Sequence, residues 1–531
     1  MSQILIKDGM IYDGTGSKPF KADILVSGEK ILEIGKPVSG EDCDVINAEG
    51  CAVSPGFIDT HTHADMSIFY DRQHSCSLLQ GVTTEIVGMC GLGLTPLNSE
   101  QFDNYVKYSA GIFDNIPGFH PDFSTVDKYL SAIVCGNNIA YSATHSAVRI
   151  AAAGFQNVPL KGDLLEKAKK ALRTSLEDGA VGFSTGLSYF PHYYSDTDEL
   201  IELCSVAAEY DVPFLVHHRT VFANNIKQFD PTWEAMEVAK RTKVKLHILH
   251  TKTSWPDTAG NIKKRFEPYY SKAKEDGVDI SFELYPYNAG SGYAVAFLPW
   301  RYTEGGYYET MKRLGDQQTS DKIVNELSKV LNEIMGDSTL VFTHLKNNVE
   351  YVGHSFEEVS RQIGLSLPKM IIKVLYENDL EVGFRGSESD DDEVNRILNK
   401  DIMELLTWPN YMVGSDSIPL GEKPNPRAFG SFAKILRMTR EMGYPLEMII
   451  NRITKLPVSR YKLGKRGELK AGMLADIVVF DPLKVVDTAT WDTPRSAPIG
   501  IPYVLVNGKI AVRNEKPTGL LAGRGLRRDK I

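Results

Sequence analysis

The sequence predicts an α/β fold in which a (β/α)8 TIM-like barrel carries a small β-sandwich domain, built from both termini, and an inserted lid. Apolar strand candidates alternate with helical stretches along the middle of the chain, which predicts the barrel, and both ends are rich in short strands. A long interruption before the last barrel strand predicts the lid. With 531 residues, of which 42% are hydrophobic, the chain can bury a large core.

The two ends of the chain have the pattern of short strands joined by turns. Apolar runs separated by Gly, Pro and Asp occur near the start, at 4–6, 10–12, 22–26 and 30–34. Near the other end, 472–481 and 502–512 are strand-like, and Asn507-Gly508 is a hairpin signal. We therefore predict a single β-sandwich domain formed by residues 1–54 and 464–531.

The middle of the chain alternates between strand-like and helix-like segments. The strand candidates are apolar runs at 53–59, 82–87, 139–144, 180–184, 213–217, 244–250, 280–285 and 411–416. Helix-like stretches lie between most of them, at 164–178, 197–209, 232–241 and 269–275. Eight strands with intervening helices are typical of a barrel, which we assign to residues 55–289 and 348–463.

The regular spacing of the strand candidates is interrupted in one place. About 125 residues separate the seventh strand candidate from the eighth, far more than an ordinary connection needs. Residues 290–347 are rich in Tyr, Gly, Lys and Glu, and we predict that they form an inserted helical lid. The short acidic run at 390–392 is interpreted as a solvated helix start.

Composition limits the partners and the compartment. The chain has 59 Lys and Arg against 68 Asp and Glu, a net charge of −9, which disfavours nucleic-acid binding. It contains no apolar run of membrane-spanning length, and its first residues do not form a secretory signal. The six cysteines are sparse and irregularly spaced, which favours free thiols in a reducing cytoplasm.

Potential metal ligands follow several of the predicted strands. The active site of such a barrel lies at the C-terminal ends of its strands, and residues two apart on a strand point to the same side. Imidazole, thiolate and carboxylate groups are zinc ligands. The candidates, in chain order, are His61 and His63 after strand one, Cys90 after strand two, His217 or its neighbour His218 after strand five, His250 after strand six, and Asp416 after strand eight.

Each of these signals alone also fits a structural role. A single buried cysteine usually packs as a small hydrophobic residue, and a His-x-His pair can belong to a core. His247, inside strand six, is interpreted as a residue of the barrel wall. The joint occurrence at the ends of several strands is what favours a metal site.

Six motifs make the sequence similar to a known group of enzymes. They are PGFIDTHTH (55–63), GVTTEIVGMCG (81–91), LHILHTK (246–252), YPYNAGS (285–291), MVGSD (412–416) and ADIVVFD (475–481). Over nearly its whole length the chain resembles the amidohydrolase superfamily, and within it the N-acyl-D-amino-acid deacylases, or D-aminoacylases. Strand four, at 180–191, lacks the lysine that hydantoinase-like members use to bridge two metals, whereas Cys90 stands where the deacylases have a cysteine.

The resemblance implies a zinc centre and a set of substrate-binding residues. It assigns a tight zinc ion to Cys90, His217 and His250, and a second, weaker metal position to His61, His63 and Asp416. It places the substrate's carboxylate and scissile carbonyl against Lys252, Tyr285, Ser291 and Arg427. Asp416 would take a proton from a zinc-activated water and pass it to the leaving amine.

The expected activity is zinc-dependent hydrolysis of a small N-acyl-D-amino acid to the D-amino acid and a carboxylate. Two departures from the family pattern concern the substrate: Asn425 precedes Pro-Arg427 where the family usually has His, and Val221 stands where it usually has an acid. Another amidohydrolase reaction, such as hydantoin-like ring opening or cleavage of a modified dipeptide, is therefore kept as an alternative. A non-catalytic scaffold is disfavoured because it would not need the whole ligand set.

Overall fold

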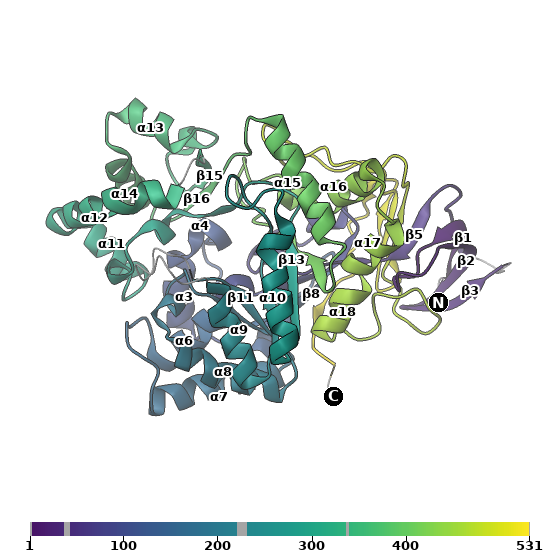
Figure 1. Cartoon of the computed structure of the whole chain (residues 1–531), viewed down its shortest axis with the longest axis horizontal. Coiled ribbons are helices and arrows are strands. Elements are labelled where there is room, and N and C mark those ends of the chain that lie inside the picture. Colours follow the sequence, from purple (N-terminus) through teal and green to yellow (C-terminus); the bar gives the residue numbers. More distant parts are fainter. Residues whose placement is uncertain (1–2, 37–42, 220–230, 336–338, 530–531) are drawn as a thin grey trace.

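The computed structural model describes residues 3–36, 43–219, 231–335 and 339–529. A barrel occupies the centre of the molecule, a sheet that contains the N-terminal strands lies at one side, and the helices α11–α14 lie at the other (Figure 1). In the described part of the chain, no helix is long and apolar enough to cross a membrane.

The barrel consists of eight parallel strand positions in chain order. Its strands are β6 (Phe57–Asp59), β7 (Val82–Val87), β8 (Asn138–Tyr141) continued by β9 (Ala143–Thr144), β10 (Phe183–Gly186), β11 (Pro213–His217), β12 (Lys245–Ile248), β13 (Ile280–Leu284) and β17 (Tyr411–Val413). The ring closes between β17 and β6, where the Thr60 amide donates a hydrogen bond to the Val413 carbonyl at 3.4 Å. The predicted fold class is confirmed.

Helices that follow the strands cover the outside of the barrel. They include α6 (His145–Ala153), α7 (Asp163–Glu177), α8 (Thr197–Glu209), α9 (Pro231–Thr242), α10 (Ile262–Asp276), α16 (Arg427–Met442), α17 (Leu446–Ile453) and α18 (Lys455–Tyr461). In α7 the buried side chains Ala168, Leu172 and Leu176 recur every four residues, so they form one apolar stripe. Asp196 caps α8 by accepting a hydrogen bond from the Glu199 amide at 2.9 Å.

The first predicted strand is wrong as a single unit, because 53–59 divides between two sheets. β5 (Ala52–Pro55) belongs to the sheet at the end of the molecule, and only β6 belongs to the barrel. The chain passes from one sheet to the other at Gly56, where a Cβ atom would lie 2.0 Å from Thr83 Oγ1. The apolar run therefore contains two strands, and the close contact at Gly56, where the chain leaves one sheet for the other, requires glycine.

Both ends of the chain contribute to one nine-stranded sheet. Its strands are β1 (Gln3–Ile11), β2 (Phe20–Ser27), β3 (Lys30–Gly35), β4 (Cys43–Asn47), β5, β18 (Ile477–Phe480), β19 (Tyr503–Val506), β20 (Lys509–Arg513) and β21 (Lys516–Pro517). The two halves meet where β5 pairs antiparallel with β18. Asn507 and Gly508 both have positive φ, at 48° and 73°, and form the predicted hairpin between β19 and β20. Beyond this sheet, β22 (Gly525–Leu526) pairs with β8 of the barrel.

The insertion between β13 and β17 is longer than the predicted lid at 290–347. A small antiparallel sheet in the order β14 (Ser291–Tyr293), β16 (Val382–Arg385), β15 (Val341–Leu345) needs its central strand from residues beyond 347. Its helices are α11 (Tyr307–Gly315), α12 (Gln317–Met335), α13 (Phe356–Ile363) and α14 (Leu367–Glu377). We call residues 291–385 the inserted unit. After it, Asp391 of the acidic run caps α15 (Asp392–Leu405).

Candidate metal centre

Six side chains with metal-ligating atoms meet at the C-terminal ends of the barrel strands. They come from the segments that follow β6, β7, β12 and β17 and from the last residue of β11, as the strand-end rule predicts. The structure brings together His61, His63, Cys90, His217, His250 and Asp416. Their ligand atoms form two overlapping groups that share the sulfur of Cys90.

The first group consists of Cys90, His217 and His250. Cys90 Sγ lies 3.6 Å from His217 Nδ1 and 3.7 Å from His250 Nε2, and these two nitrogens are 2.8 Å apart. His217, and not its neighbour His218, brings its ring into this group. One sulfur and two nitrogens at such separations can bind a single small cation.

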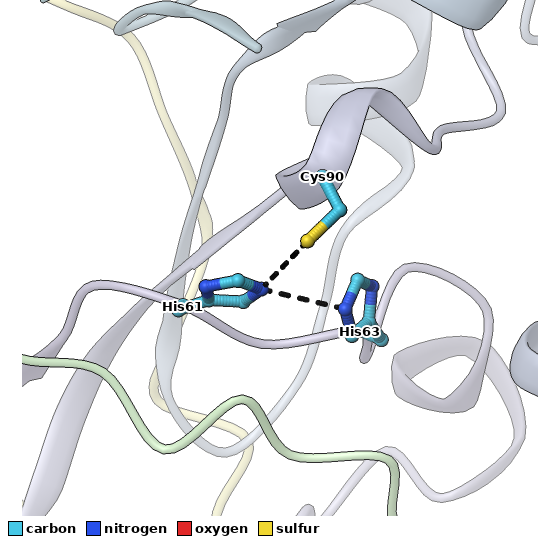
Figure 2. A group of neighbouring side chains, drawn as sticks. All are labelled: His61, His63 and Cys90. Atoms are coloured by element: carbon cyan, nitrogen blue, oxygen red, sulfur yellow. Dashed lines mark hydrogen bonds between the residues drawn. The ribbon is translucent and has the colours of Figure 1, made fainter. Parts of the chain in front are cut away.

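The second group consists of His61, His63 and Cys90 (Figure 2). His61 Nε2 lies 3.5 Å from Cys90 Sγ and 3.4 Å from His63 Nε2, so it faces both of the other side chains in Figure 2. Asp416 Oδ1 completes this group, since it lies 3.3 Å from Nε2 of each histidine. A second cation position between these atoms would share Cys90 with the first.

Three of the six residues adopt backbone conformations that L-amino acids rarely take. Cys90, His250 and Asp416 have φ values of 53°, 36° and 52°, in the left-handed region. Such strain persists only where surrounding structure fixes it, and it is concentrated at functional sites. Around Cys90, its carbonyl lies 3.2 Å from His192 Nε2, and the next amide donates to Ser184 Oγ at 2.7 Å.

A buried carboxylate that sequence reasoning missed holds His61 in place. Glu283 of β13 lies 2.5 Å from His61 Nδ1 through Oε1, and its other oxygen accepts a hydrogen bond from Thr60 Oγ1 at 2.6 Å. His247 lies on the same oxygen at 3.3 Å, which supports its interpretation as a residue of the barrel wall. The available signal was a charged residue, Glu283, inside the strand candidate at 280–285.

A buried carboxyl group joins the segments that follow the first and the last barrel strand. Asp59 Oδ1 accepts hydrogen bonds from the amide of Ser415 at 2.8 Å and from the amide of His61 at 3.1 Å. The amide of Asp416 in turn donates to the His61 carbonyl at 2.8 Å. These contacts set the position of Asp416 relative to the two histidines.

The electrostatics of the site keep the imidazoles of His217 and His250 neutral and favour positive charge beside Asp416. Burial lowers the pKa of His250 to about 4 and that of His217 well below its usual value. Burial alone would raise the pKa of Asp416, but Arg427 and the neighbouring histidines hold it well below its usual range, so the group is a carboxylate. Burial likewise opposes a charge on His61, yet Asp416, Cys90 and Glu283 raise its pKa, which means that positive charge is favoured here.

The residues expected to handle substrate form one wall beside the metal ligands. Tyr285 packs between two cations, with Lys252 Nζ 3.9 Å and the Arg427 guanidinium carbon 4.4 Å from its ring centroid. Arg427 is fully buried and forms an ion pair with Asp416 Oδ2 at 2.9 Å. Lys252 donates to the Tyr287 carbonyl. Ser291 opens the inserted unit, and its buried Oγ has no hydrogen-bond partner in the described part of the chain.

Of the two departures from the family pattern, only one lies within the described residues. Asn425 donates through Nδ2 to the carbonyls of Ala289 and Gly290, at 2.9 and 3.3 Å, and accepts from the Arg427 amide at 3.0 Å. It therefore fixes the start of α16 against the segment that leads into the inserted unit. Val221 lies outside the described residues.

A third group of possible ligands lies apart from the barrel strands. Asp114, which ends α4 (Ala110–Phe113), approaches His344 and Glu381 of the inserted unit, and His344 Nε2 lies 2.7 Å from Glu381 Oε1. The contact between His344 and Glu381 lies within the inserted unit, and only Asp114 belongs to another part of the chain. Sequence analysis did not identify this group.

The donor set of the main site fits a zinc ion. Zinc binds thiolate sulfur, imidazole nitrogen and carboxylate oxygen, and it is held by three or four such atoms. Cys90, His217 and His250 supply one sulfur and two neutral nitrogens, and a carboxylate holds the far nitrogen of His61 as is usual for a metal ligand. The fold and the site together define a barrel hydrolase with a metal centre at its strand ends.

Comparison with known proteins agrees with this class. The model of the amidohydrolase family matches residues 44–282 and 394–512. An N-acyl-D-glutamate deacylase of Alcaligenes xylosoxydans xylosoxydans is 30% identical over 531 residues, covering 99% of this chain and 96% of the relative. The chain belongs to the amidohydrolase family, in the branch that contains these deacylases.

Two solved structures are similar over the whole chain. One is the N-acyl-D-glutamate deacylase of Bordetella bronchiseptica complexed with zinc and a phosphonate that mimics the tetrahedral intermediate; its TM-score is 0.81 at 27% identity, over 99% of this chain and 100% of that one. The other is a D-aminoacylase whose binuclear metal centre shows activation by one metal and attenuation by a second; its TM-score is 0.79 at 27% identity, over 99% of each chain.

Proposed function

We propose that the protein is a zinc-dependent deacylase that hydrolyses N-acyl-D-amino acids to a D-amino acid and a carboxylate. The observation that carries this proposal is the shared sulfur of Cys90 between two histidine groups, beside a carboxylate that is paired with a buried arginine. The similar deacylases with solved metal centres support the substrate class and its D configuration. Free thiols at all six cysteines support the expected cytoplasmic location.

The metal roles follow the two groups. We assign the tight zinc to Cys90, His217 and His250, and a weaker second position to His61, His63 and Asp416. When bound, zinc would supply Lewis-acid activation of a water molecule and of the scissile carbonyl. Glu283 would keep His61 in the tautomer that presents Nε2 to this second position.

Asp416 is the proposed acid–base group. Its Oδ2 is held by Arg427, which leaves Oδ1 directed toward the ligand nitrogens of His61 and His63. As a carboxylate, Oδ1 can accept a proton from the attacking water and then deliver that proton to the nitrogen of the leaving amine. The ion pair with Arg427 fixes the carboxylate during both transfers.

The wall formed by Tyr285, Lys252 and Arg427 would orient the substrate. Burial raises the pKa of Tyr285 to about 12, so the phenol keeps its proton and can donate to the oxygen that becomes negative. Arg427 Nε and Nη1 have no hydrogen-bond partner among the described residues, and a planar guanidinium suits a carboxylate. Lys252 adds a point charge, and Ser291 a hydroxyl, on the same side.

The alternative of a hydantoin-like ring opening is less well supported. β10 carries Phe-Ser-Thr-Gly and no lysine that could bridge two metals after carboxylation, whereas Cys90 is positioned between both groups. The missing lysine and the present sulfur both favour the deacylase branch. Cleavage of a modified dipeptide differs from the proposed reaction only in the group attached to the amide.

The test is hydrolysis of matched N-acetyl-D- and N-acetyl-L-amino acids and of hydantoins, with zinc measured in the same preparation. We expect turnover of D-amides only, in protein that contains zinc. Zinc-loaded protein that hydrolyses none of the D-amides would overturn the deacylase proposal. Turnover of hydantoins and not of D-amides would support the alternative, hydantoin-like ring opening.

A further inference from the structure

Arg385 is a buried cation without an ion pair. It ends β16 with 7% of its surface exposed, and among the described residues no carboxylate oxygen lies within 4.0 Å of its guanidinium. The guanidinium donates to the carbonyls of Gly386 and Trp491, both at 3.3 Å, and lies 4.8 Å from the centroid of the Trp491 ring. Its Nε has no hydrogen-bond partner in the described structure. A buried charge is costly unless an opposite charge or a ligand compensates it.

The strand register places Arg385 on the sheet face that carries Ser291. Arg385 lies opposite Ser291 in the antiparallel pair of β16 and β14, so the two side chains leave the same face of the sheet. Tyr293, two residues after Ser291, shares that face. The Tyr293 ring centroid lies 5.7 Å from that of Tyr189, which lies 4.8 Å from that of His217.

The opposite face of the same sheet packs against other side chains of the inserted unit. Phe384, which alternates with Arg385, packs against Phe297 with ring centroids 4.9 Å apart, and against Phe356 at 6.1 Å. This face forms the core of the inserted unit. The face that carries Ser291 and Arg385 is therefore the one that borders the substrate site.

Among the described residues, only two of the four cations along this border have a carboxylate within 4.0 Å. Lys252, Arg385, Arg427 and Lys434 are the cations, and the carboxylates in contact with them are Asp416 on Arg427 and Glu388, 3.9 Å from Lys434. Two cations, Lys252 and Arg385, thus have no carboxylate within 4.0 Å among the described residues. Lys252 lies beside Arg427, and the α-carboxylate of the proposed substrate would compensate its charge.

We propose that the substrate carries a second carboxylate and that Arg385 receives it. This inference rests on the proposed deacylase function and narrows its substrate class to dianionic N-acyl-D-amino acids. The planar fork of N–H donors of a guanidinium matches the two oxygens of a carboxylate. The second carboxylate belongs either to the amino-acid side chain or to a dicarboxylic acyl group, and both present the same chemistry to Arg385.

Matched substrate pairs distinguish these two sources. The zinc-loaded protein is assayed with N-acetyl-D-glutamate against N-acetyl-D-glutamine, and with N-succinyl-D-leucine against N-butyryl-D-leucine. We expect kcat/KM to favour the charged member of one pair by at least tenfold, which identifies where the carboxylate is carried. In Arg385→Gln this preference should fall at least tenfold, mainly through KM, while the neutral member changes less than threefold.

Two variants separate recognition from folding. Arg385→Lys retains the charge without the fork and should recover part of the preference. Arg313→Gln is the matched control, since Arg313 also belongs to the inserted unit and its guanidinium donates to the carbonyls of Tyr302 and Glu304. We expect this control to leave the preference unchanged. Melting temperatures of all variants exclude misfolding as the cause of a loss.

The outcomes also separate this inference from the proposed function. Turnover of N-acetyl-D-glutamine or N-butyryl-D-leucine with no preference for a charged partner would overturn the role of Arg385 and leave the deacylase function standing. An equal loss on both members of a pair in Arg385→Gln would do the same. Failure of the zinc-loaded wild-type protein on all four D-substrates would overturn both. The wild-type comparison decides even if Arg385→Gln does not fold.

Discussion

The sulfur of Cys90 lies within 3.7 Å of three imidazole nitrogens that belong to two separate ligand groups. Burial raises the pKa of this thiol. A cation that binds the sulfur as a thiolate must therefore displace the proton of the thiol. The left-handed backbone at Cys90 aims the side chain between both groups. A single residue thereby couples the two proposed metal positions.

Glu283 is not proposed as a ligand, but we expect it to affect how tightly the second position, which includes His61, binds metal. The substitution Glu283→Gln removes the negative charge beside His61 Nδ1. The His61 tautomer that presents Nε2 to the metal is then no longer fixed. Loss of such an outer partner typically weakens metal binding about 10- to 100-fold. Competition with a chelator measures the change, and equal affinity in wild type and variant would refute the role.

Asp416 is expected to affect turnover more than the tight zinc. In Asp416→Asn the ligands Cys90, His217 and His250 remain, so zinc content should stay near the wild-type value. Because the amide can no longer take the proton, kcat should fall about 10²- to 10⁴-fold. Zinc analysis and steady-state kinetics on one preparation test both statements, and unchanged turnover would remove Asp416 from the mechanism.

At the scale of residues, the sequence predicted which side chains meet at the strand ends but not the residues that support them. His61, His63 and Cys90 follow strands directly, and strand ends converge in a barrel, so their meeting could be predicted. Glu283 lies inside a strand whose burial pattern is uniform, and nothing in the local pattern says which buried neighbour it contacts. Its pairing with His61 depends on the register between distant strands.

At the scale of elements, one of the close approaches between the inserted unit and the barrel lies at Gly111. α4 packs against β16 and β14 at Gly111, where a Cβ atom would lie 2.5 Å from the Val382 carbonyl oxygen and 2.9 Å from Tyr293 Cβ. The first of these atoms is backbone and cannot rotate away. The position of the face that carries Ser291 therefore depends on the absence of a side chain in α4.

Gly111→Ala should displace the inserted unit from the substrate site. Overpacking of this kind costs about 1–3 kcal/mol. We expect KM to rise several-fold while zinc content is unchanged, because the ligands are all on the barrel. Gly35→Ala is the control, since a Cβ there meets only Glu33 Oε1 at 4.0 Å. A normal KM in Gly111→Ala would show that the contact does not position the substrate wall.

The differences between prediction and structure at this scale have specific causes. The strand at 53–59 reads as continuous because both of its halves are buried, but the halves pair in different sheets. The insertion was predicted to end at 347 because the composition changes there. Its central strand, β16, comes later, and short strands of three or four residues carry too little pattern to be recognised.

At the scale of the whole molecule, the proposed ligands connect segments that are far apart in the chain. They follow the first, second, fifth, sixth and eighth strand positions of the barrel, so a bound ion links most of its circumference. A ligand that binds only the native state stabilises it by about 2.7 kcal/mol at one hundred times its Kd. Removal of zinc by a chelator should lower the melting temperature by several degrees, and restored zinc should reverse the change. An unchanged melting temperature would contradict this linkage.

The nine-stranded sheet has a consequence for how the protein is made. β5 leaves the ribosome before β18, and it finds this partner only after the barrel and the inserted unit have been synthesised. At roughly 5–20 residues per second, the interval is on the order of 20–80 s. During that time the edge of β5 is unpaired and apolar, and an exposed edge of this kind recruits other strands. The nascent chain should therefore depend on a chaperone at this edge, and a circular permutant that begins between β17 and β18 should depend on it less.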